Sequence, residues 1–275
     1  MLIKMIRWLK VVRPIKGQFR LIAEMFGKIG CLIMIPIANL LTIDGKVKST
    51  QGVVYSTDPK RAEGDNEVSY FIKGPDTEIV FAEIAGCTLA KDVGLTVPDI
   101  AACKAADETH AGSVKVDTPI RDVGPWLARP QSVTNFDDLF CAVVVDVWLA
   151  NKDRNMGNVL GSPLPNGMIQ LSFIDFEKSL TLRPEPRMQS TVLQPQKLWP
   201  SGELGIKLRA RKPLHPPASM LEVIHSFTAD RCTEIVHAVV NAIGVTVAWE
   251  DDSIGALMHR AGRIHKLAEE VWAIN

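Results

Sequence analysis

Signatures of several common enzyme classes are missing from this 275-residue sequence. It contains no Cys-X-X-Cys pair, no HExxH or HxH motif and no GxSxG motif. Zinc centres and hydrolysis based on His or Ser therefore have no support. The cysteines are odd in number and scattered, which indicates a reducing, cytoplasmic setting and no disulfide framework. They are Cys31, Cys87, Cys103, Cys141 and Cys232.

Long apolar runs and a net charge are also missing. The longest apolar run, Cys31 to Thr42, contains Pro36 and is shorter than the roughly 20 residues that span a membrane. Residues 1–12 are basic and apolar but lack a clear signal-peptide core and cleavage site, and an interfacial helix there stays open. Because the longest apolar run is too short, we expect no transmembrane segment. Since the formal net charge is zero, direct nucleic-acid binding has no support.

Charge is unevenly distributed, because residues 1–50 carry nine Lys or Arg against Glu24 and Asp44. This segment is either a solvated basic face or a surface for phosphate or an acidic partner.

The first half of the sequence alternates short strand patterns with one clear helix. Residues 47–56 are typical of strand, turn and strand, residues 57–66 of a loop, and Val68 to Lys73 of a strand. A helix follows Gly74-Pro75-Asp76 and ends at Gly94. Residues 99–134 mix short apolar runs with turn residues and are interpreted as a connector, whereas residues 1–45 receive no assignment.

The second half is predicted to be mostly helical. Residues 137–149 are apolar almost all round, which predicts a buried helix. Asn166-Gly167 predicts a two-residue hairpin turn. Residues 182–216 are rich in Pro, Lys and Arg and are interpreted as loop or substrate-facing surface. Two or three further helices are expected at about 218–229, 234–243 and 254–273.

The loop that follows the buried helix carries the most informative residues. Asp153 and Asn158 lie five positions apart in it, and Asp175 ends a later apolar run. A carboxylate in such a loop accepts a proton from a substrate hydroxyl. An amide oxygen and a second carboxylate suffice for Mg²⁺ that is also bound by phosphates and water. The spacing predicts a kinase-type phosphotransfer site.

Lys73, at the end of the predicted strand, and Glu83, in the following helix, form a candidate pair that would hold the ammonium against nucleotide phosphates. Glu78 competes with Glu83, but a carboxylate in the first helical turn already favours the helix dipole. The turn Ser49-Thr50-Gln51-Gly52 offers hydroxyls and backbone N–H groups that could cover phosphates, although an ordinary hairpin fits it equally.

The order of these motifs resembles the HipA-like branch of the protein-kinase-like superfamily, and more remotely the phosphatidylinositol 3-kinase-like enzymes. Residues 81–98, with Glu83 and the Gly-Leu-Thr-Val-Pro ending, are similar to the helix that the family writes as NEL…LARxLGLPVP. Residues 148–158 resemble its NxDRHxxN loop, and Ile174-Asp175-Phe176 resembles its metal-binding step. The likeness covers roughly residues 45–180.

The resemblance implies a two-lobed kinase-like α+β fold, with a β-rich N-lobe over residues 1–110 and a mostly helical C-lobe over residues 111–275. It implies that Asp153 is the catalytic base and that Asn158 and Asp175 bind Mg²⁺. ATP would contact Lys73, its partner Glu83 and the loop with Ser49, Thr50 and Gln51, of which Ser49 or Thr50 is the candidate for autophosphorylation.

The same resemblance implies a serine/threonine kinase with a protein substrate, acting as the toxin of a toxin–antitoxin pair whose antitoxin is a separate chain. The sequence departs from the family at Asn155, where the family has His. Two alternatives stay open: a small-molecule phosphotransferase on the same fold, and a non-catalytic kinase-like binding module.

Overall fold

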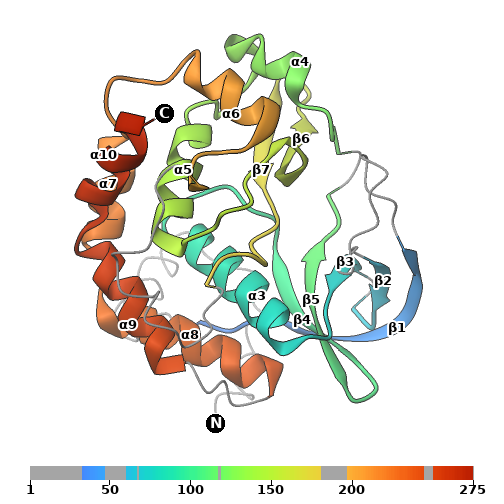
Figure 1. Ribbon diagram of the computed structural model, residues 1–275. Coiled ribbons are helices and arrows are strands. Elements are labelled where there is room, and N and C mark those ends of the chain that lie inside the picture. Colours follow the sequence, from blue (N-terminus) through green and yellow to red (C-terminus); the bar gives the residue numbers. More distant parts are fainter. Residues whose placement is uncertain are drawn as a thin grey trace, which may run out of the picture. The chain divides into compact units, whose positions relative to one another are not determined.

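The computed structural model describes residues 33–46, 60–66, 68–116, 119–180, 197–244 and 250–274. The chain divides into two units, residues 1–34 and 35–275, and the elements below belong to the second. In that unit a sheet region precedes a mostly helical part (Figure 1), so the predicted α+β class is confirmed. The predicted strand pair at 47–56, with Ser49, Thr50 and Gln51, lies outside the described residues.

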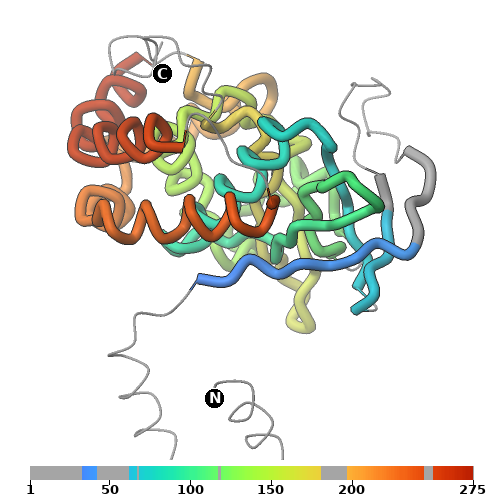
Figure 2. Tube along the Cα trace, turned by 90° about the horizontal axis from the view of Figure 1, so that it is seen from below, coloured from blue at the N-terminus to red at the C-terminus, as the bar shows by residue number. Residues whose placement is uncertain are grey.

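The sheet region is a closed five-stranded barrel with the strand order β1-β2-β3-β5-β4. Neighbouring strands are antiparallel except β1 and β4, which are parallel. In Figure 2 β1 is the long blue segment, which pairs first with β4 and then with β2. The strands are β1 (Ile37–Lys46), β2 (Lys60–Gly64), β3 (Ser69–Lys73), β4 (Ile100–Ala105) and β5 (Glu108–Val114).

Of these strands, only β3 was expected in its place. The predicted loop at 57–66 contains β2, and the predicted connector at 99–134 contains β4 and β5, so both predictions are wrong there. The predicted lobe boundary between residues 110 and 111 falls inside β5. These strands are rich in Ala, Gly, Lys and Glu, which have low strand propensity, and barrel pairing overrides that propensity.

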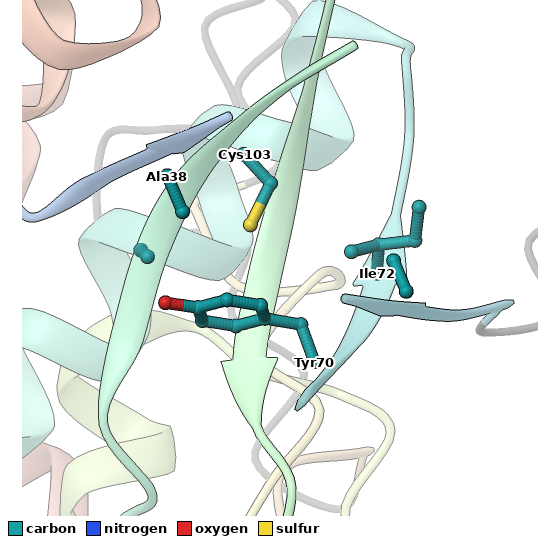
Figure 3. Packing of buried hydrophobic residues seen from close by; sticks show 6 residues of the cluster. Ala38, Tyr70, Ile72 and Cys103 are labelled. Carbon is teal, nitrogen blue, oxygen red and sulfur yellow. The ribbon is translucent and has the colours of Figure 1, made fainter. Parts of the chain in front are cut away.

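Small side chains are needed inside the barrel because one large ring fills much of its interior. Tyr70 extends across this interior toward Ala38 and Cys103 (Figure 3), and all three are buried. A Cβ on Gly112 of β5 would lie 2.2 Å from Cys103 Sγ and 3.1 Å from Tyr70 Cδ1. The glycine therefore allows β5 to pack against the side chains of β3 and β4.

The helix α3 (Thr77–Asp92) lies between the barrel and the helical part (Figure 1) and packs against β4, β5 and α8. Its N-terminus is capped by Asp76, whose side chain accepts hydrogen bonds from the backbone N–H groups of Glu78 and Ile79. Its last turn is followed by Gly94 in the left-handed conformation, with φ of +92°. The helix predicted from the sequence is confirmed.

The helical part is organised around α5 (Asp138–Leu149), which is buried as predicted and contacts α7, α9 and α10. The hairpin of β6 (Val159–Pro163) and β7 (Ile169–Phe173) follows. The sequence predicted a turn of two residues, Asn166 and Gly167. In the structure the backbone N–H of Leu164 donates to the carbonyl of Met168, so Pro165 also belongs to the turn, which is longer than expected. The remaining helices are α4 (Gly124–Leu127), α6 (Gly202–Arg209), α7 (Ala218–His225), α8 (Ala229–Ile243), α9 (Glu250–Ala261) and α10 (Ile264–Ile274).

Helices α6, α9 and α10 correct the sequence interpretation in two places. α6 lies within the stretch 182–216 that was interpreted as loop or surface. The helix expected at 254–273 is divided into α9 and α10 at Gly262 and Arg263. Of the helices in the described part of the chain, none combines the length and apolar composition needed to cross a membrane.

The fit around Gly112 gives a stability prediction. Gly112→Ala should lower the free energy of unfolding by about 1–3 kcal/mol, because the added methyl overpacks the barrel. In a Cys103→Ala background, where Sγ is gone, the same substitution should cost less. Urea unfolding of the four proteins of this double-mutant cycle measures the coupling. Equal costs in both backgrounds would show that Cys103 does not create the constraint.

Candidate active site

The ammonium group of Lys73, at the end of β3, lies among three carboxylates. Its Nζ is 2.6 Å from Asp175 Oδ1, 3.2 Å from Glu83 Oε2 and 3.5 Å from Glu177 Oε2. The Lys73 side chain is only 12% exposed. Burial by itself would lower the pKa of Lys73, but the attraction of the three carboxylates outweighs it and raises the pKa, so the ammonium stays charged.

Glu83 joins the barrel to the segment that follows β7. It is buried on α3, and its Oε2 accepts a hydrogen bond of 2.7 Å from the backbone N–H of Phe176 as well as contacting Lys73. Burial raises the pKa of Glu83, whereas Lys73 opposes that rise. One carboxylate thus fixes both the lysine and the residue next to Asp175. Glu78, the competitor for this role, is exposed in the first turn of α3.

Asp175 has an unusual backbone conformation, with φ of +68°. A non-glycine residue in this left-handed region is strained, and such residues are frequent at active sites because the surrounding contacts hold them there. The neighbouring Phe176 is buried against α3, where a Cβ on Gly86 would lie 2.6 Å from Phe176 Cβ. Helix α3 therefore has a glycine at the point where the Asp175 segment crosses it.

A buried ion pair shapes the loop that carries Asp153. Asp146, within α5, accepts hydrogen bonds of 2.9 Å from both Nε and Nη2 of Arg154 and another of 2.9 Å from Asn151 Nδ2. Asp146 and Asn151 are 0% exposed and Arg154 is 3% exposed. Bidentate pairing of this kind is geometrically specific, so it fixes the path of the loop relative to α5.

Arg154 also connects this loop to the Asp175 segment. Its Nη1 donates to the carbonyl oxygens of Asn158, at 3.1 Å, and Ile174, at 2.7 Å, and its guanidinium lies 4.8 Å from the centre of the Phe176 ring. The backbone N–H of Ile174 donates to Asn158 O at 3.1 Å. Asn158 and the residue before Asp175 are therefore held side by side.

The two asparagines of the loop have different geometries. Asn158 Nδ2 donates to the carbonyl of Asp153 at 2.6 Å, while its Oδ1 accepts no hydrogen bond from the residues that the structure describes. Asn155 Nδ2 donates to the same carbonyl at 3.0 Å, and its Oδ1 accepts from the N–H of Gly157 at 2.8 Å. Asn155 thus orders the loop from within.

Asp153 is partly buried, and its pKa is raised above the ordinary value of 3.8. The main cause is burial, and the negative charges of Asp175 and Glu177 add to it, whereas Lys178 and Asn155 favour the ionised form. A raised pKa makes this carboxylate a stronger proton acceptor than an exposed aspartate.

The donor atoms at this site suit a hard divalent cation. Asn158 offers an amide oxygen and Asp175 a carboxylate, the two kinds of oxygen that Mg²⁺ accepts from proteins. Within the described ranges no group of three or more His, Cys, Asp or Glu could hold a metal alone. A cation here would therefore need further ligands, such as phosphate oxygens.

The structure brings five predicted residues into one site: Lys73, Glu83, Asp153, Asn158 and Asp175. Their catalytic and ligand roles stay predictions, and Ser49, Thr50 and Gln51 lie outside the described residues.

Sequence reasoning missed the residues that position this set, which are Asp146, Asn151, Arg154 and Glu177. A usable signal existed for Asp146, which is the single charge between Leu139 and Leu149 in an otherwise apolar helical stretch. Such a charge needs a buried partner.

Comparison with known proteins gives structural likenesses only. No protein-family model matches the sequence, and no curated protein matches it. The Helicobacter pylori proinflammatory kinase CtkA is similar with a TM-score of 0.46 and 15% identity, covering 78% of this chain and 94% of that one. The Golgi casein kinase, solved with Mn and ADP bound, has a TM-score of 0.44 and 11% identity, covering 88% of this chain and 74% of that one. Because these scores and identities are low, neither likeness assigns a chemistry to the site.

The buried pair of Asp146 and Arg154 gives a second stability prediction. Asp146→Ala should cost about 3–5 kcal/mol of unfolding free energy, because it leaves the Arg154 guanidinium buried without its counter-charge. Asp92→Ala removes one carboxylate partner of Arg231, in a more exposed ion pair, and leaves Glu234 in place, so it should cost at most about 1 kcal/mol. Chemical denaturation of both variants tests the difference. Similar small costs would mean that the Asp146 pair does not hold the loop in place.

Proposed function

We propose that this protein is an ATP- and Mg²⁺-dependent kinase with a two-lobed kinase-like fold, which transfers the γ-phosphate to a Ser or Thr hydroxyl of a protein. The observation that carries the proposal is the ammonium of Lys73 between Glu83 and Asp175, at 3.2 and 2.6 Å. This pairing joins the barrel, α3 and the Asp175 segment at one charged centre. The barrel with α3 would form the N-lobe and the part from α4 onward the C-lobe.

The charge balance of the site supports a metal-bound nucleotide as its ligand. Asp175, Glu83 and Glu177 surround the buried ammonium of Lys73, and Asp153 adds a fourth carboxylate close enough to feel the charges of Asp175 and Glu177. Polyphosphate alone would be repelled by these carboxylates, whereas a divalent cation held by Asn158 and Asp175 would offset charge on both sides. Lys73 would contact the phosphates, and Glu83 would keep it in position.

The role of Asp153 follows from its place and its environment. It lies in the loop held by Arg154, where its carboxylate would accept the proton of the attacking hydroxyl as the oxygen bonds to the γ-phosphorus and ADP leaves. Catalysis of this kind depends on positioning and on charge stabilisation more than on covalent chemistry. Asn155, at the position where the HipA-like kinases have His, makes loop contacts of its own, which favours an active enzyme over a non-catalytic module.

The finer parts of the proposal rest on the resemblance of residues 148–158 and 174–176 to the HipA-like kinases. These parts are the protein Ser/Thr acceptor, autophosphorylation at Ser49 or Thr50, and action as a toxin that a separate antitoxin chain inhibits. Transfer of phosphate to a small molecule instead of a protein would contradict these finer parts.

The proposal predicts a separation between binding and chemistry. Asp153→Asn should reduce phosphoryl transfer by about 10²-fold or more while Mg²⁺–ATP still binds, because only the proton acceptor is lost. Asp175→Asn should abolish transfer and also weaken metal-dependent nucleotide binding. Lys73→Ala should weaken nucleotide binding. Transfer is measured with γ-labelled ATP and intact mass, and binding by calorimetry.

Asp251→Asn serves as the control for these variants, since Asp251 is exposed on α9 and should leave transfer and binding unchanged. Wild-type transfer by both Asp153→Asn and Asp175→Asn would contradict the assignment. Labelling of small hydroxyl compounds with no protein labelled would replace the protein acceptor by a small molecule.

The raised pKa of Asp153 predicts how the rate depends on pH. The base works only when deprotonated, so kcat should fall as pH drops through this pKa. Because Lys178 favours the ionised form, Lys178→Gln should raise the pKa further and move the acid limb of the kcat profile to higher pH. Lys266→Gln, on the exposed side of α10, is the control. A limb that stays in place or moves to lower pH would argue against Asp153 as the base.

A further inference from the structure

A pocket of about 530 Å³ lies beside the loop that carries Asp153. Its basic wall consists of Lys152, Lys197 and Arg209, and its apolar wall includes Trp199 and Ile206. Helix α6 contributes Arg209 and Ile206 and packs against the turn Met156–Asn158. The pocket therefore lies between the proposed catalytic loop and α6, a helix that was not predicted from the sequence.

The described side chains that line this pocket carry charge of one sign only. Three basic side chains line it, and none of the described residues that line it is acidic. Lys152 and Lys197 are exposed, and neither makes an ion pair or side-chain hydrogen bond with the residues that the structure describes. The acidic residue of α6, Glu203, is 3.2 Å from Lys207 and does not line the pocket. Like charges gathered in one pocket favour an anionic ligand.

The pocket borders the chain on both sides of Asp153. Lys152 directly precedes Asp153, so their Cα atoms are about 3.8 Å apart. On the other wall, the backbone N–H of Ser201 donates to the carbonyl of Arg154 at 2.8 Å. One wall thus includes Lys152, which precedes Asp153, and the other is hydrogen-bonded to Arg154, which follows it.

The wall formed by Trp199 and α6 is firmly packed. Trp199 is 4% exposed, its Nε1 donates to Gly205 O at 3.2 Å, and its ring meets that of Trp272 with centroids 5.3 Å apart. A Cβ on Gly205 would lie 2.0 Å from Pro200 O, so the helix approaches this segment as closely as glycine allows. Because this wall is packed before a ligand binds, the backbone positions of Ile206 and Arg209 on α6 are set in advance, which lowers the entropic cost of binding.

An apolar contact beside the charges favours a peptide over a small free anion. Ile206 lines the same pocket and is 66% exposed. A polypeptide can place an acidic side chain against the basic wall and an apolar one on Ile206, whereas inorganic phosphate satisfies only the charges. Exposed apolar groups next to polar ones are typical of surfaces that bind other proteins.

We propose that this pocket recognises the acceptor protein through an acidic side chain close in sequence to the phosphorylated hydroxyl. Glu, Asp or a phosphorylated residue supplies the same chemistry, an anion for Lys152, Lys197 and Arg209. The idea that the pocket selects an acceptor rests on the proposed kinase function, but anion binding by the pocket does not.

Binding without nucleotide tests the pocket independently of catalysis. We would measure fluorescence anisotropy of labelled Ser-centred peptides flanked by Glu, by phosphoserine or by Lys, at low salt. The Glu and phosphoserine peptides should bind, and comparison of the two identifies the preferred anion. The double variant Lys197→Glu with Arg209→Glu should weaken their binding by about tenfold or more and favour the Lys peptide instead.

Lys266→Glu is the matched control, because it also reverses a lysine but lies on α10 and does not line the pocket. Equal affinity of wild type for the Glu and Lys peptides would overturn the proposal. So would a double variant that keeps wild-type affinity for the Glu peptide.

Kinetics then separate failure of the pocket from failure of the kinase assignment. In an active kinase, Lys197→Glu should raise KM for the acidic peptide while kcat and the KM for ATP change little. Transfer with no dependence on flanking charge would reject the pocket and keep the kinase. Charge-selective peptide binding, with no transfer to any acceptor, would reject the kinase and keep the pocket as an anion-binding surface.

Discussion

The buried ion pair between Asp146 and Arg154 is the interaction on which the site depends. It connects α5 to the loop of Asp153, and the remaining donor of Arg154 reaches the carbonyls of Asn158 and Ile174. Removing a guanidinium from water is costly, and here that cost is offset by two carboxylate bonds, two carbonyl bonds and two aromatic rings. A single side chain thereby places the proposed base and both proposed metal ligands in one arrangement.

A second charged centre, at Lys73, also holds together segments that are far apart in the sequence. It draws together β3, α3 and the segment after β7, although Lys73 and Asp175 are 102 residues apart in the sequence. The two centres meet at Phe176, whose N–H donates to Glu83 and whose ring stacks on Arg154. The strained backbone of Asp175 is held between them, which is why a left-handed aspartate is tolerated there.

Sequence patterns predicted the elements with strong local signals. Helix α3 begins after Asp76 and ends before Gly94, and the almost entirely apolar stretch from Leu139 to Leu149 predicted α5. The barrel was mostly missed because β2, β4 and β5 use charged and small residues whose strand state is decided by their neighbours. Gly112 shows the reason: it is unfavourable in an isolated strand, yet it is required where Cys103 and Tyr70 fill the interior.

The sequence by itself determined the identity and order of the reactive groups, because spacing within one loop and position after one strand are local properties. Asp153, Asn158 and Asp175 could be nominated on that basis, and so could Lys73 with Glu83. Only the tertiary structure decided that Lys73 is shared by three carboxylates, that Arg154 is buried on Asp146, and that Lys152, Lys197 and Arg209 line one pocket. These are contacts between distant segments, and their energies arise from burial and charge that exist only after the chain has folded.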